Sequence, residues 1–412
     1  MSENKIAIVL GGTSPHSILV QKLKVRGYYV LLVDYLDNPP AKQFADEHIQ
    51  ASTLDKDVVL KIALEKKADI IISTCIDQAN SVCCYVAEKL NLPHPYSYET
   101  SLNVTDKELM KRIMMDNGIP TSSYIVVEDM DNIDWTKVKF PAVVKPVDCN
   151  SSKGVRKVDS IGEAKLRIAE AIELSRTHKA IIEGFNKGEE IQVDCVAVQT
   201  GVEVVLTRQK NKISNSGNEM VLQSRGSIIP APIDESLNYQ VHAIAEKIAS
   251  SFGLTNTPFF YQAIMTDAGI KVLEFAPRIG GGLSYYLIKE LAGFDVVEAA
   301  IDSFIGKPIE YNASHIEKCY STNLIYMMPG VFDHIEGLHE LKEDGLAYEV
   351  FTLKAKGTII DNDMRSSNRI AAFIIEANTF DELTQKEKKA INKIEIRDNN
   401  GNALLNRSIY NF

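Results

Sequence analysis

The stretch FPAVVKPVDCNSSKGV, residues 140–155, carries the first strong structural signal in this chain. Its apolar beginning predicts a short buried strand that ends at the rigid pair Lys145-Pro146. A lysine at the end of a buried strand needs an anion, and the hydroxyl and N–H donors of the loop at 148–154 suit phosphate oxygens. The order is not that of a Walker A loop, so the stretch alone indicates either a phosphate site or a solvated turn.

Two more strands are predicted downstream. IIEGF at 181–185 is apolar and runs into polar residues, and EIQVDCV at 190–196 alternates like a half-buried strand. Backbone groups near Glu183 and Phe185 can pair with the edge of an adenine, and Glu190 can accept hydrogen bonds from ribose hydroxyls. The alternative for either glutamate is a solvated charge.

A hairpin with ligand-forming side chains is predicted next. FFYQAIM at 259–265 and IKVLEF at 270–275 read as strands joined by a glycine turn at 267–269. This pairing is expected to place Gln262 beside Glu274. Both side chains offer the hard oxygen ligands that Mg²⁺ prefers when phosphates supply the remaining positions.

The stretch APRIGGG, residues 276–282, follows this hairpin directly. An arginine beside a metal site can stabilise charge on a transferring phosphoryl group, and the glycines permit close approach. In this order, the parts resemble the ATP-grasp superfamily of carboxylate–amine ligases and their carboxylating and carbamoylating relatives. The resemblance covers nearly the whole chain, and Thr105-Asp106-Lys107 with Asn117–Thr121 is similar to the entry into the family's ATP-binding region.

The resemblance implies an α/β (α+β) ATP-grasp enzyme that uses ATP and Mg²⁺ (or Mn²⁺). It implies catalytic roles for Arg278 and Lys145 and metal binding by Gln262 and Glu274. The ATP contacts that it implies are Lys107, Lys145, Ser151, Ser152, Gly154, Glu183, Gly184, Phe185 and Glu190. Many members have glutamate at the position of Gln262 and asparagine at that of Ala276, so one metal site is expected to be weaker here.

Three domains are expected. Residues 1–102 would form a Rossmann-like domain, 103–308 a two-lobed ATP-grasp domain with a lid at about 122–182, and 309–412 a small C-terminal α+β domain. The predicted strands in the first domain lie at 6–10, 29–34 and 69–73. The predicted helices lie at 17–26, 161–177, 238–252, 283–293 and 380–391.

The N-terminal pattern raises a rival hypothesis, a dinucleotide-dependent oxidoreductase. Asp34 ends the second strand, as the acidic residue of such enzymes does, but the Gly-x-Gly-x-x-Gly fingerprint is absent and Pro15 and His16 occupy the turn. His16 is therefore a candidate for a substrate-side role, and simple turn and cap chemistry is an equally strong alternative.

A polar segment, RQKNKISNSGNEMVLQSR at 208–225, is expected to be a loop over the site. Arg208, Lys210 and Arg225 are candidates for contacts with an anionic substrate or the γ-phosphate. The alternative is a solvated basic loop, which we favour for Lys210. Gly280 and Gly281 are further substrate-side candidates.

Composition agrees with an ordinary soluble enzyme. The chain has 412 residues, is 45% hydrophobic and carries a net charge of −10, which argues against a nucleic-acid surface. It lacks an apolar run long enough to span a bilayer, and its first residues lack the order of a signal peptide, so we expect a cytoplasmic protein that does not bind membranes. The six cysteines form no Cys-x-x-Cys pair and are expected to be free thiols. Family members are often dimers, so a homodimer is compatible with the resemblance.

The reaction implied is phosphorylation of a small carboxylate, an amino acid, to an acyl phosphate that then couples to an amine. The alternative is a carboxylating or carbamoyl-phosphate-type enzyme that uses bicarbonate, and a third class is a nucleotide-binding protein without turnover. The sequence leaves the identity of both substrates open.

Overall fold

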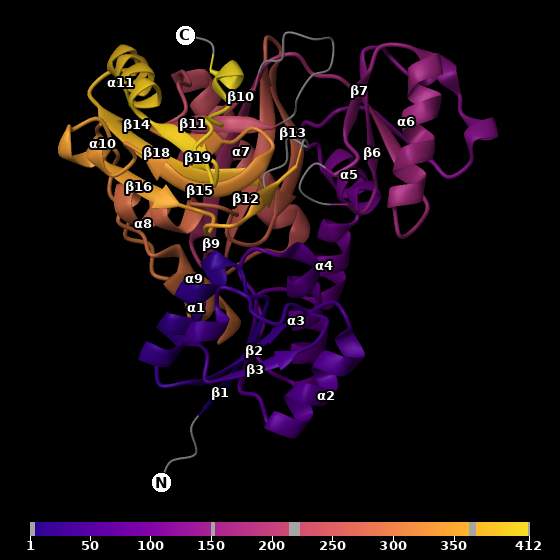
Figure 1. Cartoon of the computed structure of the whole chain (residues 1–412). Coiled ribbons are helices and arrows are strands. Elements are labelled where there is room, and N and C mark those ends of the chain that lie inside the picture. The colour runs from indigo at the N-terminus through magenta and orange to yellow at the C-terminus, as the bar shows by residue number, and fades with distance from the viewer. Residues whose placement is uncertain (1–4, 150–152, 214–222, 362–367, 411–412) are drawn as a thin grey trace. The chain divides into compact units, whose positions relative to one another are not determined.

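The structure is a computed structural model that describes residues 5–149, 153–213, 223–361 and 368–410 (Figure 1). The chain divides into two compact units. Unit 1 contains residues 1–126, 192–206 and 234–315, and unit 2 contains residues 127–191, 207–233 and 316–412. The described residues contain no helix that is long and apolar enough to cross a membrane.

Unit 1 begins with a parallel sheet, as the sequence predicts. Its strands, in the order β3-β2-β1-β4, are β3 (Glu47–Gln50), β2 (Tyr29–Asp34), β1 (Ile6–Leu10) and β4 (Ile70–Ile72). Helices α1 (Ser14–Val25), α2 (Lys56–Lys66) and α3 (Asp77–Leu90) accompany these strands (Figure 1). Helix α1 begins at Ser14, earlier than predicted, because a proline such as Pro15 fits the first helical turn.

The rest of unit 1 is built around a hairpin and helices. The hairpin consists of β12 (Thr257–Thr266) and β13 (Gly269–Ala276), which pair in antiparallel fashion. The sheet order continues from β13 and β12 to β9 (Glu189–Val198) and β10 (Gly201–Lys212), of which the end of β9 and the beginning of β10 belong to this unit. The helices are α4 (Tyr98–Thr105), α5 (Lys107–Asp116), α7 (Glu235–Phe252), α8 (Ser284–Ala292) and α9 (Val296–Phe304).

Unit 2 contains a small antiparallel sheet covered by one helix. Strand β6 (Ala142–Pro146) lies between β8 (Ala180–Gly184) and β7 (Arg156–Val158), and α6 (Ile161–Leu174) packs beside them (Figure 1). The strand β5 (Tyr124–Val127) ends where unit 2 begins. Strand β6 includes Lys145 and Pro146, so it ends later than predicted. Pro146 is the last residue of β6, where the missing N–H costs the strand little.

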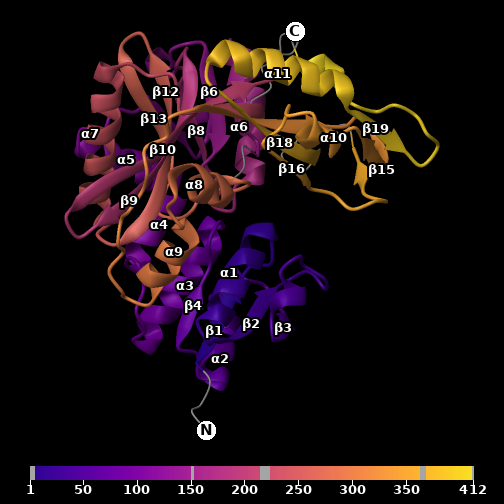
Figure 2. The same cartoon turned by 90° about the vertical axis from the view of Figure 1, so that its left-hand side faces the viewer.

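The part of the eight-stranded sheet that lies in unit 2 continues from the end of β10 in the order β11-β14-β18-β16, with antiparallel neighbours. These strands are β11 (Ser224–Ile229), β14 (Cys319–Tyr326), β18 (Arg369–Ala377) and β16 (Glu349–Thr352). Helix α11 (Phe380–Lys393) lies along this sheet, as Figure 2 shows, and Phe373, Ile375 and Ile391 belong to the apolar core between them. The remaining elements of unit 2 are β15 (Gly330–Glu336), α10 (Glu340–Glu343), β17 (Ile359–Ile360) and β19 (Glu395–Asp398).

Candidate active site

The two predicted metal ligands lie side by side in unit 1. Gln262 on β12 is the register partner of Glu274 on β13, and a shift in the register follows directly after Gln262. The tight turn sets the pairing from Thr266–Gly269 to Ala263–Val272, and that register alone would place Gln262 opposite Leu273. The irregularity after Gln262 shifts its partner to Glu274. The prediction that the hairpin places these two side chains together is confirmed.

The pair offers one amide oxygen and one carboxylate. The described residues contain no group of three or more His, Cys, Asp or Glu side chains that could hold a metal ion. A cation at Gln262 and Glu274 would therefore need further ligands from phosphate oxygens or water. This donor set fits Mg²⁺, which is usually bound by one or two carboxylates together with substrate phosphates.

Arg278 follows this hairpin and is paired with Asp77, the first residue of α3. Its Nε and Nη2 donate to the two carboxylate oxygens of Asp77 at 2.5 Å each, and its Nη1 donates to the carbonyl of Ile279 at 2.9 Å. The guanidinium carbon lies 5.2 Å from the centre of the Phe260 ring. Burial alone would lower the pKa of Arg278, but Asp77 and, more weakly, Glu274 outweigh burial and raise it. Arg278 is therefore a fixed cation near the predicted metal ligands.

The two glycines proposed as substrate contacts differ in their surroundings. A Cβ atom at Gly280 would lie 2.5 Å from the Ser284 hydroxyl oxygen and 2.8 Å from the Gln192 amide nitrogen, so packing requires glycine there. A Cβ at Gly281 would meet no atom within 4 Å. The space beside the Gly281 backbone is therefore open.

His16 lies inside unit 1 and is 0% exposed. Its Nδ1 lies 2.8 Å from the Thr13 hydroxyl, and its Nε2 lies 3.2 Å from the Ser73 hydroxyl, which donates to the carbonyl of Leu10. This geometry assigns the ring proton to Nε2, because Ser73 already uses its own proton. Burial lowers the pKa of His16 to about 4. The neutral imidazole thus ties the loop after β1 to the end of β4.

Asp34 is also engaged within this loop region. Its carboxylate accepts hydrogen bonds from the backbone N–H groups of Gly12 and Leu36 at 2.7 and 2.8 Å. A Cβ at Gly12 would lie 2.4 Å from the side chain of Pro39, so this turn is closely packed. These contacts further weaken the oxidoreductase hypothesis, which needs that carboxylate for a ribose.

In unit 2, Lys145 forms an ion pair with Glu183. Their side chains lie on the neighbouring strands β6 and β8, with 2.7 Å between Nζ and Oε1, and are 11% and 2% exposed. The backbone N–H of Phe185 donates to the carbonyl of Pro141, so this predicted adenine donor is engaged in the chain itself. The expected phosphate lysine and adenine-hinge glutamate are therefore brought together.

The loop after β6 is described only in part. Ser151 and Ser152, two predicted phosphate contacts, lie outside the described residues. Gly154 has a φ of +72°, and a Cβ there would lie 2.8 Å from side-chain atoms of Leu174 and Pro146. Both the backbone angle and the packing therefore favour glycine at this position.

Glu190 is held by two lysines of β10. Lys210 lies 2.5 Å from Oε1 of Glu190, and Lys212 forms an ion pair with Oε2. Burial alone would raise the pKa of Glu190, but the two lysines outweigh burial and lower it to about 2. The expectation of a half-buried strand at 190–196 is wrong, because Glu190 is only 7% exposed and Ile191 on the opposite face is also buried.

The segment expected to be a loop is largely strand where it is described. Strand β10 continues through Lys212, and its pairing with β11 satisfies the backbone groups that a loop would leave to solvent. Arg208 lies buried on β10, and Lys210 is paired rather than solvated. Arg225 on β11 forms an ion pair with Glu387 of α11. The residues at 214–222 lie outside the described part of the chain.

Lys107 and Lys111 are both buried on α5. Lys107, a predicted phosphate contact, is the first residue of the helix. Lys111 donates to the Thr121 hydroxyl at 2.8 Å, and that hydroxyl donates to the carbonyl of Val272 at 2.7 Å. The sequence analysis did not select Lys111, although its four-residue spacing from Lys107 places both on one helix face.

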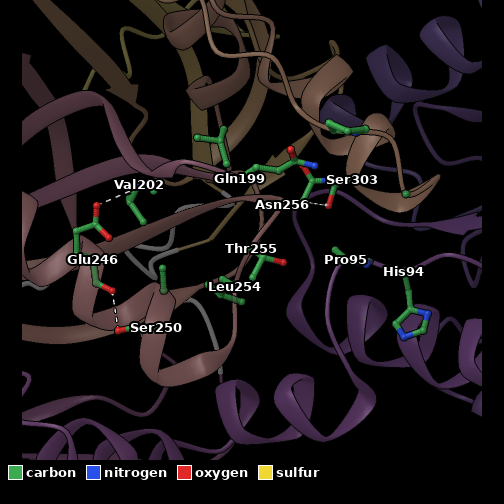
Figure 3. Close-up of a pocket in the computed structure, with 15 residues that line it drawn as sticks. His94, Pro95, Gln199, Val202, Glu246, Ser250, Leu254, Thr255, Asn256 and Ser303 are labelled. Atoms are coloured by element: carbon green, nitrogen blue, oxygen red, sulfur yellow. Dashed lines mark hydrogen bonds between the residues drawn. The ribbon is translucent and has the colours of Figure 1, made fainter.

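An open pocket of about 620 Å³ also lies in unit 1 (Figure 3). Its lining includes His94, Gln199, Glu246 and Asn256, and none of the predicted ATP, metal or substrate residues. Glu246 accepts the backbone N–H of Val202, and Asn256 bonds backbone groups of Lys307 and Ile309. These polar groups therefore hold the walls of the pocket together.

Comparison with known proteins identifies the class of this molecule. Residues 105–282 match the family model described as phosphoribosylglycinamide synthetase, ATP-grasp (A) domain. The D-alanine–D-alanine ligase of Thermosipho africanus is 29% identical over 253 residues, which cover 58% of this chain and 67% of that protein.

Solved structures agree with this match. The L-amino acid ligase from Bacillus licheniformis has a TM-score of 0.80 and 20% identity, with 97% of this chain and 100% of that chain covered. The N5-carboxyaminoimidazole ribonucleotide synthetase from Thermotoga maritima has a TM-score of 0.74 and 19% identity, with 96% and 99% covered. These structures share the fold of this chain over nearly its whole length.

The match over residues 105–282 and the likeness of these structures confirm the predicted resemblance to the ATP-grasp superfamily and the predicted fold class. Ligases of this class form carbon–nitrogen bonds, release ADP and use ATP with Mg²⁺.

Proposed function

We propose that the chain is a carboxylate–amine ligase that activates a small carboxylate, an amino acid, as an acyl phosphate and joins it to an amine. The observation that carries this proposal is the placement of Arg278, which Asp77 holds near the Gln262–Glu274 pair. A fixed cation and two metal-type ligands suit a site where negative charge accumulates on a transferring phosphoryl group.

The reaction would proceed in two displacements. A carboxylate oxygen of the first substrate attacks the γ-phosphorus of ATP, the bond to the bridging oxygen breaks, and ADP leaves with that electron pair. The amine then attacks the acyl carbon, loses a proton and expels inorganic phosphate. Mg²⁺ bound at Gln262 and Glu274 would neutralise phosphate charge.

The residues of unit 2 would hold the nucleotide. Lys145 would contact phosphate oxygens, Glu183 and Gly184 would lie along the adenine, and Glu190 would accept hydrogen bonds from the ribose hydroxyls. The low pKa of Glu190 supports its role, because an ionised carboxylate accepts hydrogen bonds from both hydroxyls. Similarity to an enzyme named for joining two D-alanines supports an amino acid as the first substrate.

The test is phosphate release from MgATP by the purified protein. Pools of amino acids and small carboxylates are supplied with and without amines, and Glu274→Ala and Arg278→Ala serve as inactive controls. Release that requires an amino acid and is lost in both variants supports the ligase. If no pool supports phosphate release, the remaining function is nucleotide binding without turnover.

A bicarbonate-using enzyme is the second candidate, because Gln262 and Ala276 resemble the carbamoylating and carboxylating members. Bicarbonate as the sole acid in the same assay separates the two. Phosphate release that requires bicarbonate and no organic carboxylate would favour this second function.

A further inference from the structure

Asp77 lies 201 positions before Arg278 in the sequence, yet its carboxylate accepts from one whole edge of the guanidinium. We propose that Asp77 is a positioning residue that fixes Arg278 so that its other edge faces the oxygens of the transferring phosphoryl group. This inference rests on the proposed function.

The hydrogen bonds determine which donors remain. Asp77 accepts from Nε and from Nη2, and the carbonyl of Ile279 accepts from Nη1. One N–H on each terminal nitrogen is therefore not donated to any described residue. Two such donors on a planar guanidinium match two oxygens of a phosphoryl group or carboxylate.

The surroundings hold this pair in one orientation. The side chains of Arg278 and Asp77 are only 13% and 14% exposed, and the Phe260 ring lies 5.2 Å from the guanidinium carbon. Asp77 is the first residue of the fourteen-residue helix α3, where the helix dipole favours a carboxylate. The helix dipole thus stabilises the Asp77 carboxylate in addition to the ion pair with Arg278.

Asp77 also keeps Arg278 away from a competing acid. Glu274 is close enough to raise the pKa of Arg278, but within the described part of the chain Glu274 is in no ion pair. Without Asp77, the buried guanidinium would turn toward Glu274, because a buried charge requires a partner. The predicted metal ligand would then be occupied by the arginine that should act beside it.

A direct substrate contact is the competing role for Asp77, since a carboxylate can also bind the amine substrate. The two roles predict different kinetics. A positioning residue affects kcat through Arg278, whereas a substrate contact affects the KM of the amine.

The experiment compares Asp77→Asn and Asp77→Glu with wild type. Asp302→Asn is the matched control, because Asp302 pairs with Arg26 at 2.7 Å and is 15% exposed in the same unit. The first readout is the Nε–H signal of Arg278 in protein with ¹⁵N-labelled arginine, assigned by its absence from Arg278→Lys. We expect slow hydrogen exchange at this N–H in wild type, Asp302→Asn and Asp77→Glu, and fast exchange in Asp77→Asn.

The second readout is nucleotide binding without any acid substrate. Asp77→Asn should bind MgADP within about 2-fold of wild type but lose at least ~10-fold of the affinity gained when fluoroaluminate, a mimic of the transferring phosphoryl group, is added. With a turnover substrate, kcat should fall ~10²-fold at nearly constant KM, and Asp77→Glu should recover part of that loss.

Slow exchange at Nε in Asp77→Asn, or an unchanged kcat with a KM for the amine raised more than about 10-fold, would overturn the proposal. If no carboxylate supports turnover, the proposed function fails, while the Nε–H signal and the fluoroaluminate affinity still decide the role of Asp77.

Discussion

Arg278 in unit 1 and Arg225 in unit 2 are both paired with carboxylates, but their surroundings differ. Arg278 and Asp77 lie near the Gln262–Glu274 pair, and Arg278 retains donors that no described residue accepts. Arg225 instead pairs with Glu387 on α11, beside the core residues Tyr326 and Tyr410. One pair is placed to meet a ligand, and the other joins β11 to the helix that covers its sheet.

An arginine near the end of a strand is therefore, by itself, weak evidence for a substrate site. What separates the two arginines is the neighbouring chemistry, metal-type ligands in one case and an apolar core in the other. We therefore expect replacement of Arg278 to lower the reaction rate and replacement of Arg225 to lower the stability of the folded protein.

Replacing Arg278 tests the first half of the comparison. Arg278→Ala should lower the rate of phosphate release by ~10²- to 10³-fold, because removing one preorganised donor from a reacting phosphoryl group costs that much. The rate constant is measured at saturating MgATP. Arg278→Lys keeps the charge but not the paired donors, and should also lose most of the activity. A fully active Arg278→Lys would show that charge alone suffices.

Replacing Arg225 tests the second half. Arg225→Met should lower the free energy of unfolding by about 3 kcal/mol, because it leaves the buried carboxylate of Glu387 without a partner. Denaturant unfolding measures this change, and activity per folded molecule should be unaltered. The double variant Arg225→Met with Glu387→Leu should recover most of the stability.

The pH dependence of Arg225→Met follows from Glu387. Burial already raises the pKa of Glu387 although Arg225 opposes it, and loss of Arg225 raises that pKa further. The folded state then favours the protonated acid, so stability should fall as pH rises above the ordinary pKa of a glutamate. Wild-type stability together with a raised substrate KM would instead restore Arg225 as a substrate contact.

Lys210 and Lys212 form a third arrangement, in which two lysine side chains pair with one carboxylate. Lys210→Met and Lys212→Met should each weaken MgATP binding ~10-fold, about the worth of one charged hydrogen bond. The pKa of Glu190 should rise from about 2 as its partners are removed.

Nucleotides that lack the ribose hydroxyls provide the control for this prediction. Titration calorimetry with ATP and 2′,3′-dideoxy-ATP should show that wild type prefers ATP and that both variants lose this preference. An equal loss of affinity for the two nucleotides would place the lysines on phosphate instead of behind Glu190.

The smallest expected effect concerns His16, which contacts no carboxylate within the described part of unit 1. Its pKa is lowered to about 4 by burial, so the unfolded chain binds the proton more tightly. Stability should be fully present above the ordinary histidine pKa and fall by about 1 kcal/mol between pH 7 and 5.5. In His16→Gln this part of the pH dependence should disappear, as unfolding at the two pH values would show.

Several elements follow from local sequence alone. Strands β1 and β2 have the predicted bounds, because unbroken apolar runs flanked by turns leave few alternatives. The hairpin is also local, since the short turn at 267–268 joins its strands, but the register of Gln262 with Glu274 additionally requires the irregularity after Gln262. The error at 208–212 arose because these polar residues are typical of a solvated loop, whereas pairing with β11 and ion pairs with Glu190 hold them in a strand.

The sequence alone predicts the resemblance to the ATP-grasp superfamily and the hairpin that carries Gln262 and Glu274, because each motif consists of residues close together in the chain. The ion-pair partners of the charged groups, in contrast, depend on the tertiary structure. Asp77 meets Arg278 and Lys212 meets Glu190 because separate strands and helices bring them together, and buried charges are stable only where such partners exist. The periodicity of the local sequence does not predict which charged residues pair.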